Sequence, residues 1–183
     1  MSPYSRSSTV VKILKACKDK EIKIICSESR PRYEGRKLAK ELRNHFEVIL
    51  TTDAAIFSFI DEADIVLTGA DAILKEHVIN KVGTAAITLC ANEKKKPFYV
   101  AASSYKVFPF IFIKEERKEE IWRKAPKEIK IRNFYFDATP CEHINSFITE
   151  NGISKGKPSF KFKIADEINR IKELLSRKYH LLK

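Results

Sequence analysis

Residues 67–84, LTGADAILKEHVINKVGT, combine side chains that can hold an anion with one that can move a proton. Asp71 follows an apolar run and could act as a general acid or base. Asn80 and Lys81 supply hydrogen-bond donors and a positive charge. Gly83-Thr84 then marks a helix start, where free backbone N–H groups attract anions. The alternative is that Asp71 is a turn or cap residue and that the two donors are ordinary surface residues.

A second polar group lies nearer the beginning of the chain. Ser7-Ser8-Thr9 precedes an apolar helical pattern, so its hydroxyls could bind a phosphate or could simply cap the helix. Lys106 adds another positive charge. Arg30 could pair with a ligand carboxylate or phosphate, or with the neighbouring Glu28 or Glu34.

Alternating strands and helices must position these groups. Short β-branched runs predict strands at 22–26, 46–50, 64–70 and 97–102, and apolar spacing predicts helices at 10–17, 33–44, 54–63 (capped by Asp53) and 85–93. Residues 77–82 form a short strand or turn in this interpretation, 133–140 a loop or strand, and 143–150 a late strand. This order indicates an α/β fold with a mostly parallel sheet and helices on both faces. We expect one domain over residues 1–160 and an amphipathic helix over 161–183.

Ligands of such folds bind beyond the carboxyl ends of the strands. Residues 27–30, 51–53, 69–71 and 103–106 follow predicted strands, and the loop 5–9 enters the first helix, so these segments could converge on one crevice. The chain has neither a GxGxxG dinucleotide fingerprint nor a P-loop.

Composition narrows the class of protein. The 183 residues are 44% apolar, contain no long apolar run and open without a signal-peptide pattern, which predicts a cytoplasmic protein without a membrane span. The four cysteines form no CxxC pair, so we expect reduced thiols and no metal site or cofactor. The net charge of +11 favours acidic partners, although a lysine-rich surface is also common for solubility. No basic and aromatic motif supports direct nucleic-acid binding.

An ordered set of motifs resembles one family. SSTVVKILK, ESRPRYEGRKLAKEL, GADAIL, VINKVGTAAITLCA, PFYVAASSYK and FDATP are similar to the alpha, beta and delta regulatory subunits of eukaryotic translation initiation factor 2B. The family also includes archaeal factor 2B-like proteins and isomerases of ribose-1,5-bisphosphate and methylthioribose-1-phosphate. The resemblance covers about residues 5–155. It implies a Rossmann-like domain of the NagB/RpiA/CoA-transferase type, usually dimeric.

The resemblance also assigns residues. The aspartate that moves protons in the isomerases matches Asp71, and their acid–base cysteine falls on Ser5. A serine hydroxyl is far less acidic than a thiol and replaces it poorly. The substrate-holding positions correspond to Ser7, Ser8, Thr9, Asn80, Lys81 and Lys106.

Three departures from the family pattern stand out. The first is Ser5 in place of the cysteine. The second is that we expect the family's N-terminal helical domain to be absent. The third is the turn between Asp71 and Asn80, which is one residue shorter than in the family pattern and lacks its glycine.

These features support two functions, and a third interpretation is a truncated or divergent copy with only a structural role. The first is a non-catalytic factor 2B-like protein of translation initiation that acts through protein contacts, either with its own copies or with the alpha subunit of initiation factor 2. The alternative is a sugar-phosphate isomerase, or a degenerate relative that binds a sugar phosphate or nucleotide. Phe108, Phe110, Phe112 and Trp122 could fill a homodimer interface or complete the domain's own core.

Overall fold

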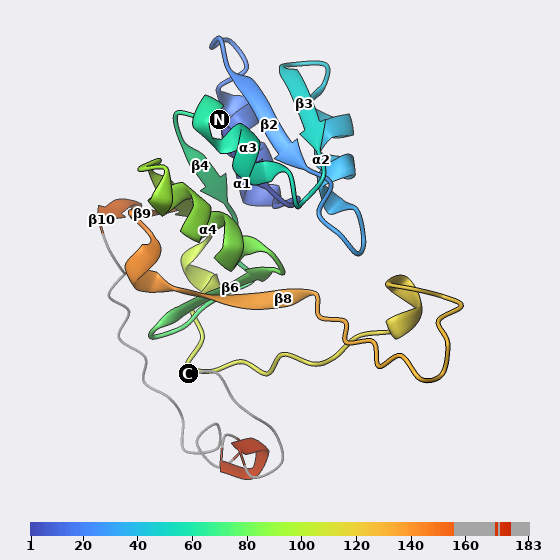
Figure 1. Ribbon diagram of the computed structural model, residues 1–183. Coiled ribbons are helices and arrows are strands. Elements are labelled where there is room, and N and C mark those ends of the chain that lie inside the picture. Colours follow the sequence, from blue (N-terminus) through green and yellow to red (C-terminus); the bar gives the residue numbers. More distant parts are fainter. Residues whose placement is uncertain (156–170, 172, 177–183) are drawn as a thin grey trace.

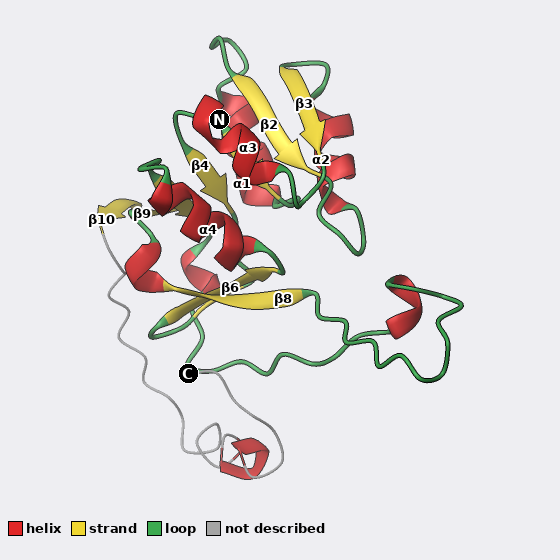
Figure 2. Cartoon of the chain, in the orientation of Figure 1, coloured by secondary structure: helices red, strands yellow, loops and turns green. Residues whose placement is uncertain are grey.

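A parallel sheet forms the centre of the molecule (Figures 1 and 2). The computed structural model describes residues 1–155, 171 and 173–176. Strands β1 (Ser2–Tyr4), β4 (Val66–Thr68), β7 (Phe98–Ala101) and β9 (Ser146–Thr149) pair in parallel, and β10 (Gly152–Lys155) adds an antiparallel edge. Strands β2 (Lys23–Ser27) and β3 (Glu47–Thr51) form a second parallel pair.

The backbone of Met1 joins the two groups of strands. Its amino group donates to the carbonyl of Lys23 over 2.9 Å, and its carbonyl accepts from the N–H of Ile25 over 3.0 Å. The strand order is therefore β3-β2-β1-β4-β7-β9-β10. The chain moves outward in one direction from β1 and in the other from β4, so the sheet has a topological switch point between these two strands.

Helices cover both faces of this sheet (Figure 1). On one face α1 (Ser8–Ala16) and α2 (Glu34–Leu42) pack their apolar sides on Ile24, Cys26 and Leu67. On the other, α3 (Ile56–Phe59), the following 3₁₀ turn Ile60–Glu62 and α4 (Thr84–Glu93) pack on Val66, Phe98 and Val100. Val66 and Leu67 face opposite ways, as neighbours in a strand must. The predicted α/β class with a mostly parallel sheet and helices on both faces is confirmed.

A small antiparallel sheet lies beside the carboxyl ends of the strands. Strands β5 (Ala72–Ile73), β6 (His77–Lys81) and β8 (Phe136–Pro140) form it over a minor core of Ala72, Leu74 and Ile79. The β5–β6 hairpin closes with a hydrogen bond of 2.7 Å from the Leu74 N–H to the His77 carbonyl. Neither residue between them has a positive φ, so this turn closes without glycine.

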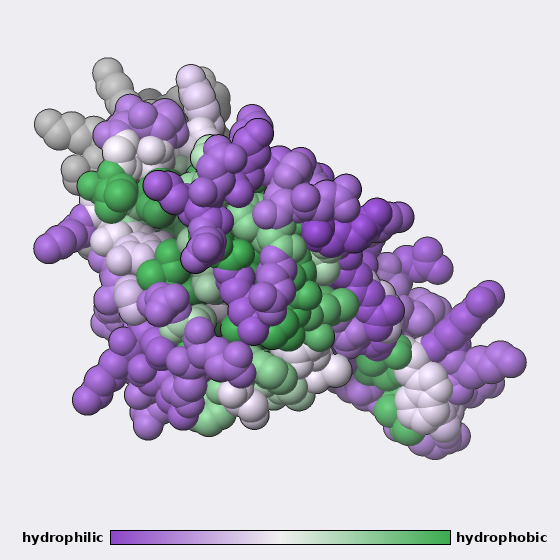
Figure 3. Space-filling view, turned by 90° about the horizontal axis from the view of Figure 1, so that it is seen from above, coloured by the Kyte–Doolittle hydropathy of each residue, from purple (hydrophilic) through white to green (hydrophobic). Residues whose placement is uncertain are grey.

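Residues 108–133, hereafter the arm, first pass along the small antiparallel sheet, where Ile111 and Ile113 pack on its minor core, and then extend away from the domain (Figure 1). The arm carries the 3₁₀ turn Lys118–Glu120, and its two limbs are joined by a hydrogen bond from the Glu116 N–H to the Asn133 carbonyl. Five large apolar side chains of the arm are between 40% and 49% exposed: Phe108, Phe112, Ile121, Trp122 and Ile129. In Figure 3 apolar side chains are visible on the arm, at the right of the view.

Several sequence expectations need correction. Residues 2–4 are a strand, β1, which was missed because a three-residue strand leaves no measurable pattern. Strands β5 and β10 were also missed, and the strand expected over 64–70 is limited to Val66–Thr68. Asp53 does not cap the next helix with its side chain. Its carboxylate accepts from the Ser27 hydroxyl at 2.6 Å and from the backbone N–H groups of Ser29 and Arg30 at 2.8 and 2.7 Å.

Most of the helix expected over 161–183 lies outside the described residues, although residues 171 and 173–176 are helical. Among the residues that the structure describes, no helix combines the length and apolar content needed to cross a membrane.

Candidate ligand-binding pocket

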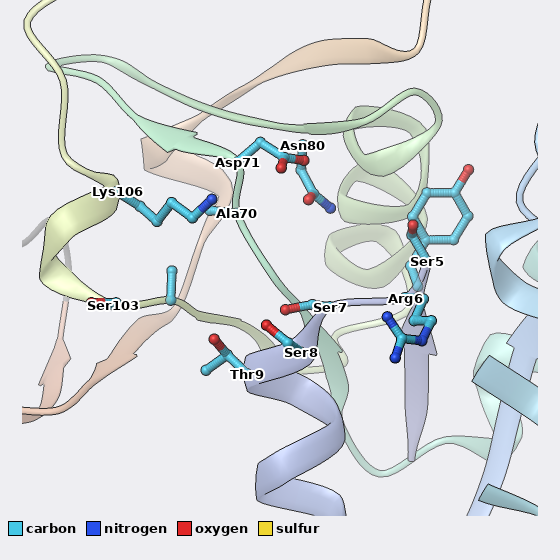
Figure 4. Close-up of a pocket in the computed structure, with 12 residues that line it drawn as sticks. Ser5, Arg6, Ser7, Ser8, Thr9, Ala70, Asp71, Asn80, Ser103 and Lys106 are labelled. Carbon is cyan, nitrogen blue, oxygen red and sulfur yellow. The ribbon is translucent and has the colours of Figure 1, made fainter. Parts of the chain in front are cut away.

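A cavity of about 260 Å³ opens at the switch point of the sheet (Figure 4). It collects the segments that follow the carboxyl ends of β1, β4 and β7. Its lining residues are Tyr4, Ser5, Arg6, Ser7, Ser8, Thr9, Ala70, Asp71, Asn80, Ala102, Ser103 and Lys106. Seven of the residues that the sequence singled out as ligand-holding or catalytic are among them: Ser5, Ser7, Ser8, Thr9, Asp71, Asn80 and Lys106.

The loop from β1 to α1 supplies hydroxyl groups and helix N–H groups. Ser5 is buried and takes a left-handed conformation with φ of 61°, which turns the chain from the strand into the helix. A non-glycine residue in this region costs about 1–3 kcal/mol, so surrounding contacts must hold it there. Ser7 is the N-cap, with its Oγ accepting from the Val10 N–H at 3.5 Å. The first turn of α1 therefore presents both hydroxyls and backbone donors toward the cavity, an arrangement suited to an anion.

Gly69 allows this loop to approach the end of β4. A Cβ added to Gly69 would lie 2.5 Å from both the Cβ and the Oγ of Ser7. No side chain fits between the two segments, so the glycine of the GAD motif fixes the distance between the hydroxyl cluster and Asp71.

Asp71 and Asn80 come together because the β5–β6 hairpin folds back on itself. The Asp71 N–H donates to the Ile79 carbonyl at 2.8 Å. The Nδ2 of Asn80 donates to the Oγ1 atoms of Thr68 and Thr84, at 2.8 and 3.0 Å, which fixes the amide plane at the cavity wall. Desolvation raises the pKa of Asp71, and Glu34 raises it further. Lys106 and Lys81 oppose the shift. A carboxyl group with a raised pKa is closer to the acidity needed to exchange protons near neutral pH.

Two cations belong to the cavity. The side chain of Lys106 points into it from the 3₁₀ turn Ser104–Lys106, opposite the hydroxyls of Ser7, Ser8 and Thr9 (Figure 4). Arg6 lies on the other side of those hydroxyls, and its Nε donates to Glu41 at 3.0 Å. Sequence reasoning missed Arg6. Its position between Ser5 and Ser7, inside a polar loop that enters a helix, was the available indication.

Lys81 and Arg30 do not line the cavity. Lys81 is 4% exposed and its Nζ pairs with Glu34 at 3.0 Å, 5.2 Å above the ring of Tyr135. It points away from Asn80 because consecutive strand residues face opposite sides. Arg30 lies over the Tyr33 ring at 4.9 Å and donates to its hydroxyl. The loops after β2 and β3 form their own network around Asp53, on the far side of the switch point.

Asp137 is a half-buried carboxylate that sequence reasoning did not single out. It lies on β8, and its Oδ2 accepts from the N–H groups of Gly83 and Ala85, at 2.7 and 3.3 Å, at the start of α4. Burial raises its pKa and these two hydrogen bonds oppose the shift. Its role is to cap α4 in place of a local side chain, since the N-cap residue is Gly83. Only the motif FDATP gave an indication of it.

The arrangement is suited to a small polyhydroxylated anion. Hydroxyls and amides can share hydrogen bonds with sugar hydroxyls, and Lys106 with the α1 N-terminus can balance a phosphate charge. Asp71 supplies one proton-exchanging group, and Ser5 lines the same cavity. Within the described part of the chain, no cluster of three or more His, Cys, Asp or Glu is placed to hold a metal ion.

Comparisons with known proteins agree with this description. The model of the Initiation factor 2 subunit family matches residues 3–156. A ribose 1,5-bisphosphate isomerase from Methanocaldococcus jannaschii is 41% identical over 162 residues, which cover 82% of this chain and 53% of that protein. A putative translation initiation factor eIF-2B subunit 2-like protein from Pyrococcus horikoshii is 42% identical over 157 residues, covering 82% and 55%.

The solved structures include a similar fold. The translation initiation factor eIF-2B of Pyrococcus horikoshii OT3 matches with a TM-score of 0.75 and 38% identity, over 84% of this chain and 57% of that one. The chain thus spans about half the length of the curated relatives it matches.

Proposed function

Because the chain belongs to the initiation factor 2 subunit family, we propose that it binds a phosphorylated pentose in the switch-point cavity and that it does not turn this ligand over efficiently. One observation carries the proposal. Three strand ends bring Ser7, Ser8 and Thr9, Asp71 and Lys106 around one cavity of about 260 Å³. A hydroxyl-rich helix start opposite an ammonium group is the chemistry that a sugar phosphate requires.

The weak catalysis follows from Ser5. An aldose–ketose conversion removes a proton from one carbon and returns one to its neighbour, so it needs groups that both release and accept protons. Asp71 can do this, because desolvation raises its pKa. The hydroxyl of Ser5 cannot match it, since it remains protonated at any ordinary pH, whereas a thiol has a pKa of about 8.5. Binding is therefore expected to survive where catalysis does not.

Calorimetric titration of the full chain with ribose 1,5-bisphosphate tests the proposal. We expect saturable binding that weakens about tenfold or more in Lys106→Ala, because a charge-assisted hydrogen bond contributes about 1.5–3 kcal/mol. Lys37→Ala, an exposed lysine on α2 outside the cavity, is the matched control and should bind as the unmodified chain does. No heat and no thermal stabilisation at millimolar ligand would refute a binding role, because a bound ligand must raise the apparent stability.

Turnover of the same compound separates a binder from an isomerase. We expect conversion to the ketose form to be barely above the uncatalysed rate. The identity to the isomerase from Methanocaldococcus jannaschii supports the opposite outcome, efficient isomerisation with Asp71 as the acid–base residue. Robust turnover by the unmodified chain would establish that second function and remove the first.

A role in translation initiation through protein contacts is the third part of the proposal. The 42% identity to the eIF-2B subunit 2-like protein of Pyrococcus horikoshii supports it. The apolar side chains exposed on the arm, Trp122 among them, offer a surface to a second copy of the chain or to the alpha subunit of initiation factor 2.

Light scattering of the purified chain tests for contact between two copies of the chain. A pull-down with the purified alpha subunit of initiation factor 2 tests for contact with that subunit. A monomer that retains no alpha subunit would contradict both.

A further inference from the structure

Two buried threonines hold the side chain of Asn80 at the cavity wall. Thr68 ends β4 and Thr84 begins α4, and both side chains are fully buried. The Nδ2 of Asn80 lies 2.8 Å from the Oγ1 of Thr68 and 3.0 Å from the Oγ1 of Thr84. Neither threonine lines the cavity, so any effect that they have on a ligand must pass through Asn80.

The hydroxyl protons of both threonines are already in use. The Oγ1 of Thr84 donates to the Lys81 carbonyl over 2.6 Å, and the Oγ1 of Thr68 donates to the Tyr4 carbonyl over 3.4 Å. A hydroxyl has one proton to donate, so toward Asn80 both threonines can only accept. The amide must therefore turn its NH₂ group toward them. A reversed amide would place its oxygen against two oxygens with no proton between them, and a buried polar group without a partner is costly.

This orientation leaves Asn80 with one kind of contact to offer a ligand. Its Nδ2 has two protons and gives one to each threonine, so only the Oδ1, an acceptor, remains for the cavity. Asp71 lies at the base of the same β5–β6 hairpin and is also an acceptor when it is ionised. This side of the cavity can therefore bind the hydroxyl groups of a ligand, whereas a phosphate oxygen there would face acceptors.

The opposite side of the cavity has the reverse polarity. Lys106 brings an ammonium group, which can only donate, and the first turn of α1 brings backbone N–H groups (Figure 4). The start of α4, where the sequence predicted free N–H groups, is not a second anion site, because Asp137 accepts from the N–H groups of Gly83 and Ala85. A ligand with both phosphate and hydroxyl groups is therefore oriented, with a phosphate toward Lys106 and hydroxyls toward Asn80.

We propose that Thr68 and Thr84 are specificity-determining residues. By fixing the Asn80 amide with its oxygen toward the cavity, they make the site require a hydroxyl group on the ligand at this position. They are positioning residues, since they act through Asn80. The inference rests on the proposed function, because it assumes that the cavity holds a phosphorylated pentose. A ligand that lacks this hydroxyl would leave the Oδ1 without a donor.

Calorimetry of the full chain with ribose 1,5-bisphosphate and with its 2-deoxy and 3-deoxy analogues tests the inference. We expect at least one analogue to bind roughly tenfold or more weakly, because the Asn80 acceptor loses its partner. Thr84→Val removes the hydroxyl and frees one Asn80 proton, so the amide can turn over and the preference should shrink by about threefold or more. Thr84→Ser, which keeps the hydroxyl, should retain the preference. Thr68→Val should act as Thr84→Val does and provides a second measurement if that variant does not fold.

Thr88→Val is the matched control. Thr88 is also fully buried on α4, and its hydroxyl donates to the Thr84 carbonyl over 2.7 Å rather than bonding to Asn80. This variant loses a buried hydroxyl and should keep the preference.

A merely structural role of the two threonines would weaken the binding of all three compounds equally. That result, or equal affinities for the three compounds in the unmodified chain, would overturn the inference and leave sugar-phosphate binding intact. An unchanged preference in both Thr68→Val and Thr84→Val would overturn it as well. If ribose 1,5-bisphosphate itself does not bind, the proposed function is wrong and this inference falls with it.

Discussion

Replacing Gly69 by alanine should damage the pocket through one atom. The new Cβ would lie 2.5 Å from the Cβ and Oγ of Ser7, so Ser7 must move by about 1 Å to reach an ordinary contact of 3.4 Å. Overpacking of this kind costs about 1–3 kcal/mol. With a urea m-value of about 2 kcal/mol per molar, the unfolding midpoint should fall by about 0.5–1.5 M.

The loss should be reversible by a second change. Ser7→Gly deletes both atoms that the alanine would strike, and glycine at an N-cap costs only a few tenths of a kcal/mol. The next neighbour of the new Cβ is the Ala101 carbonyl oxygen at 3.8 Å, an ordinary contact. Gly69→Ala combined with Ser7→Gly should therefore be about as stable as Ser7→Gly alone, which gives a coupling energy equal to the cost of Gly69→Ala, about 1–3 kcal/mol.

Urea unfolding of the four proteins, followed by circular dichroism, measures this coupling. Ribose 1,5-bisphosphate binding should weaken in Gly69→Ala, because the displaced Ser7 carries the first turn of α1 with it. Additive stability losses in the double variant would refute the close approach of β4 and α1 that the structure describes.

The remaining predictions concern single groups. Ser5→Cys should raise turnover of ribose 1,5-bisphosphate by about 10²-fold or more over Ser5→Ala, the usual contribution of a positioned acid–base group, and equal rates for the two variants would remove the thiol argument. Glu34→Gln breaks the ion pair with Lys81 and should lower the unfolding free energy by about 1–3 kcal/mol, less than for a fully buried pair because part of Glu34 is exposed. Lys81→Met in the same chain should recover much of this loss. A melting temperature unchanged by Glu34→Gln would contradict a stabilising pair. Asp71 has a raised pKa in the folded state, so folding disfavours its ionised form. The contribution of Asp71 to the free energy of unfolding is therefore fully present at acid pH and is lost as the pH rises through the folded pKa. Asp71→Asn should therefore be more stable than the unmodified chain at pH 7, and the difference should disappear near pH 3; a difference that grows on acidification would reverse this sign.

The sequence was sufficient for the central elements of the fold. Strands 22–26, 46–50 and 97–102 are continuous apolar patterns, and they and most of the helices around them are found with small shifts at their ends. The helix expected over 54–63 is shorter, with α3 over Ile56–Phe59 followed by the 3₁₀ turn Ile60–Glu62. Strand β1 could not be predicted in the same way, because a strand of three residues owes its existence to its partners β2 and β4 rather than to its own pattern. The antiparallel sheet depends on pairing between β6 and β8, residues more than fifty positions apart, which a local pattern does not encode.

The position of the cavity could be predicted from the sequence, whereas the residues that line it could be predicted only in part. The rule that ligands bind at the carboxyl ends of strands placed Ser7, Asp71 and Lys106 together. It failed for Arg30, which belongs to the far side of the switch point, since the strand order is a tertiary property. Lys81, which the family resemblance placed beside Asn80 at the ligand, does not line the cavity, because Asn80 and Lys81 are adjacent in a strand and cannot both face it.

The two loop networks at the strand ends have an evolutionary consequence. Asp53 holds the loop after β2 through three hydrogen bonds, and none of its partners lines the cavity. Substitutions that alter ligand choice in the loops after β1, β4 and β7 can therefore accumulate without disturbing that network. A domain divided in this way can exchange one small-molecule ligand for another, or lose catalysis altogether, while its folding requirements stay the same.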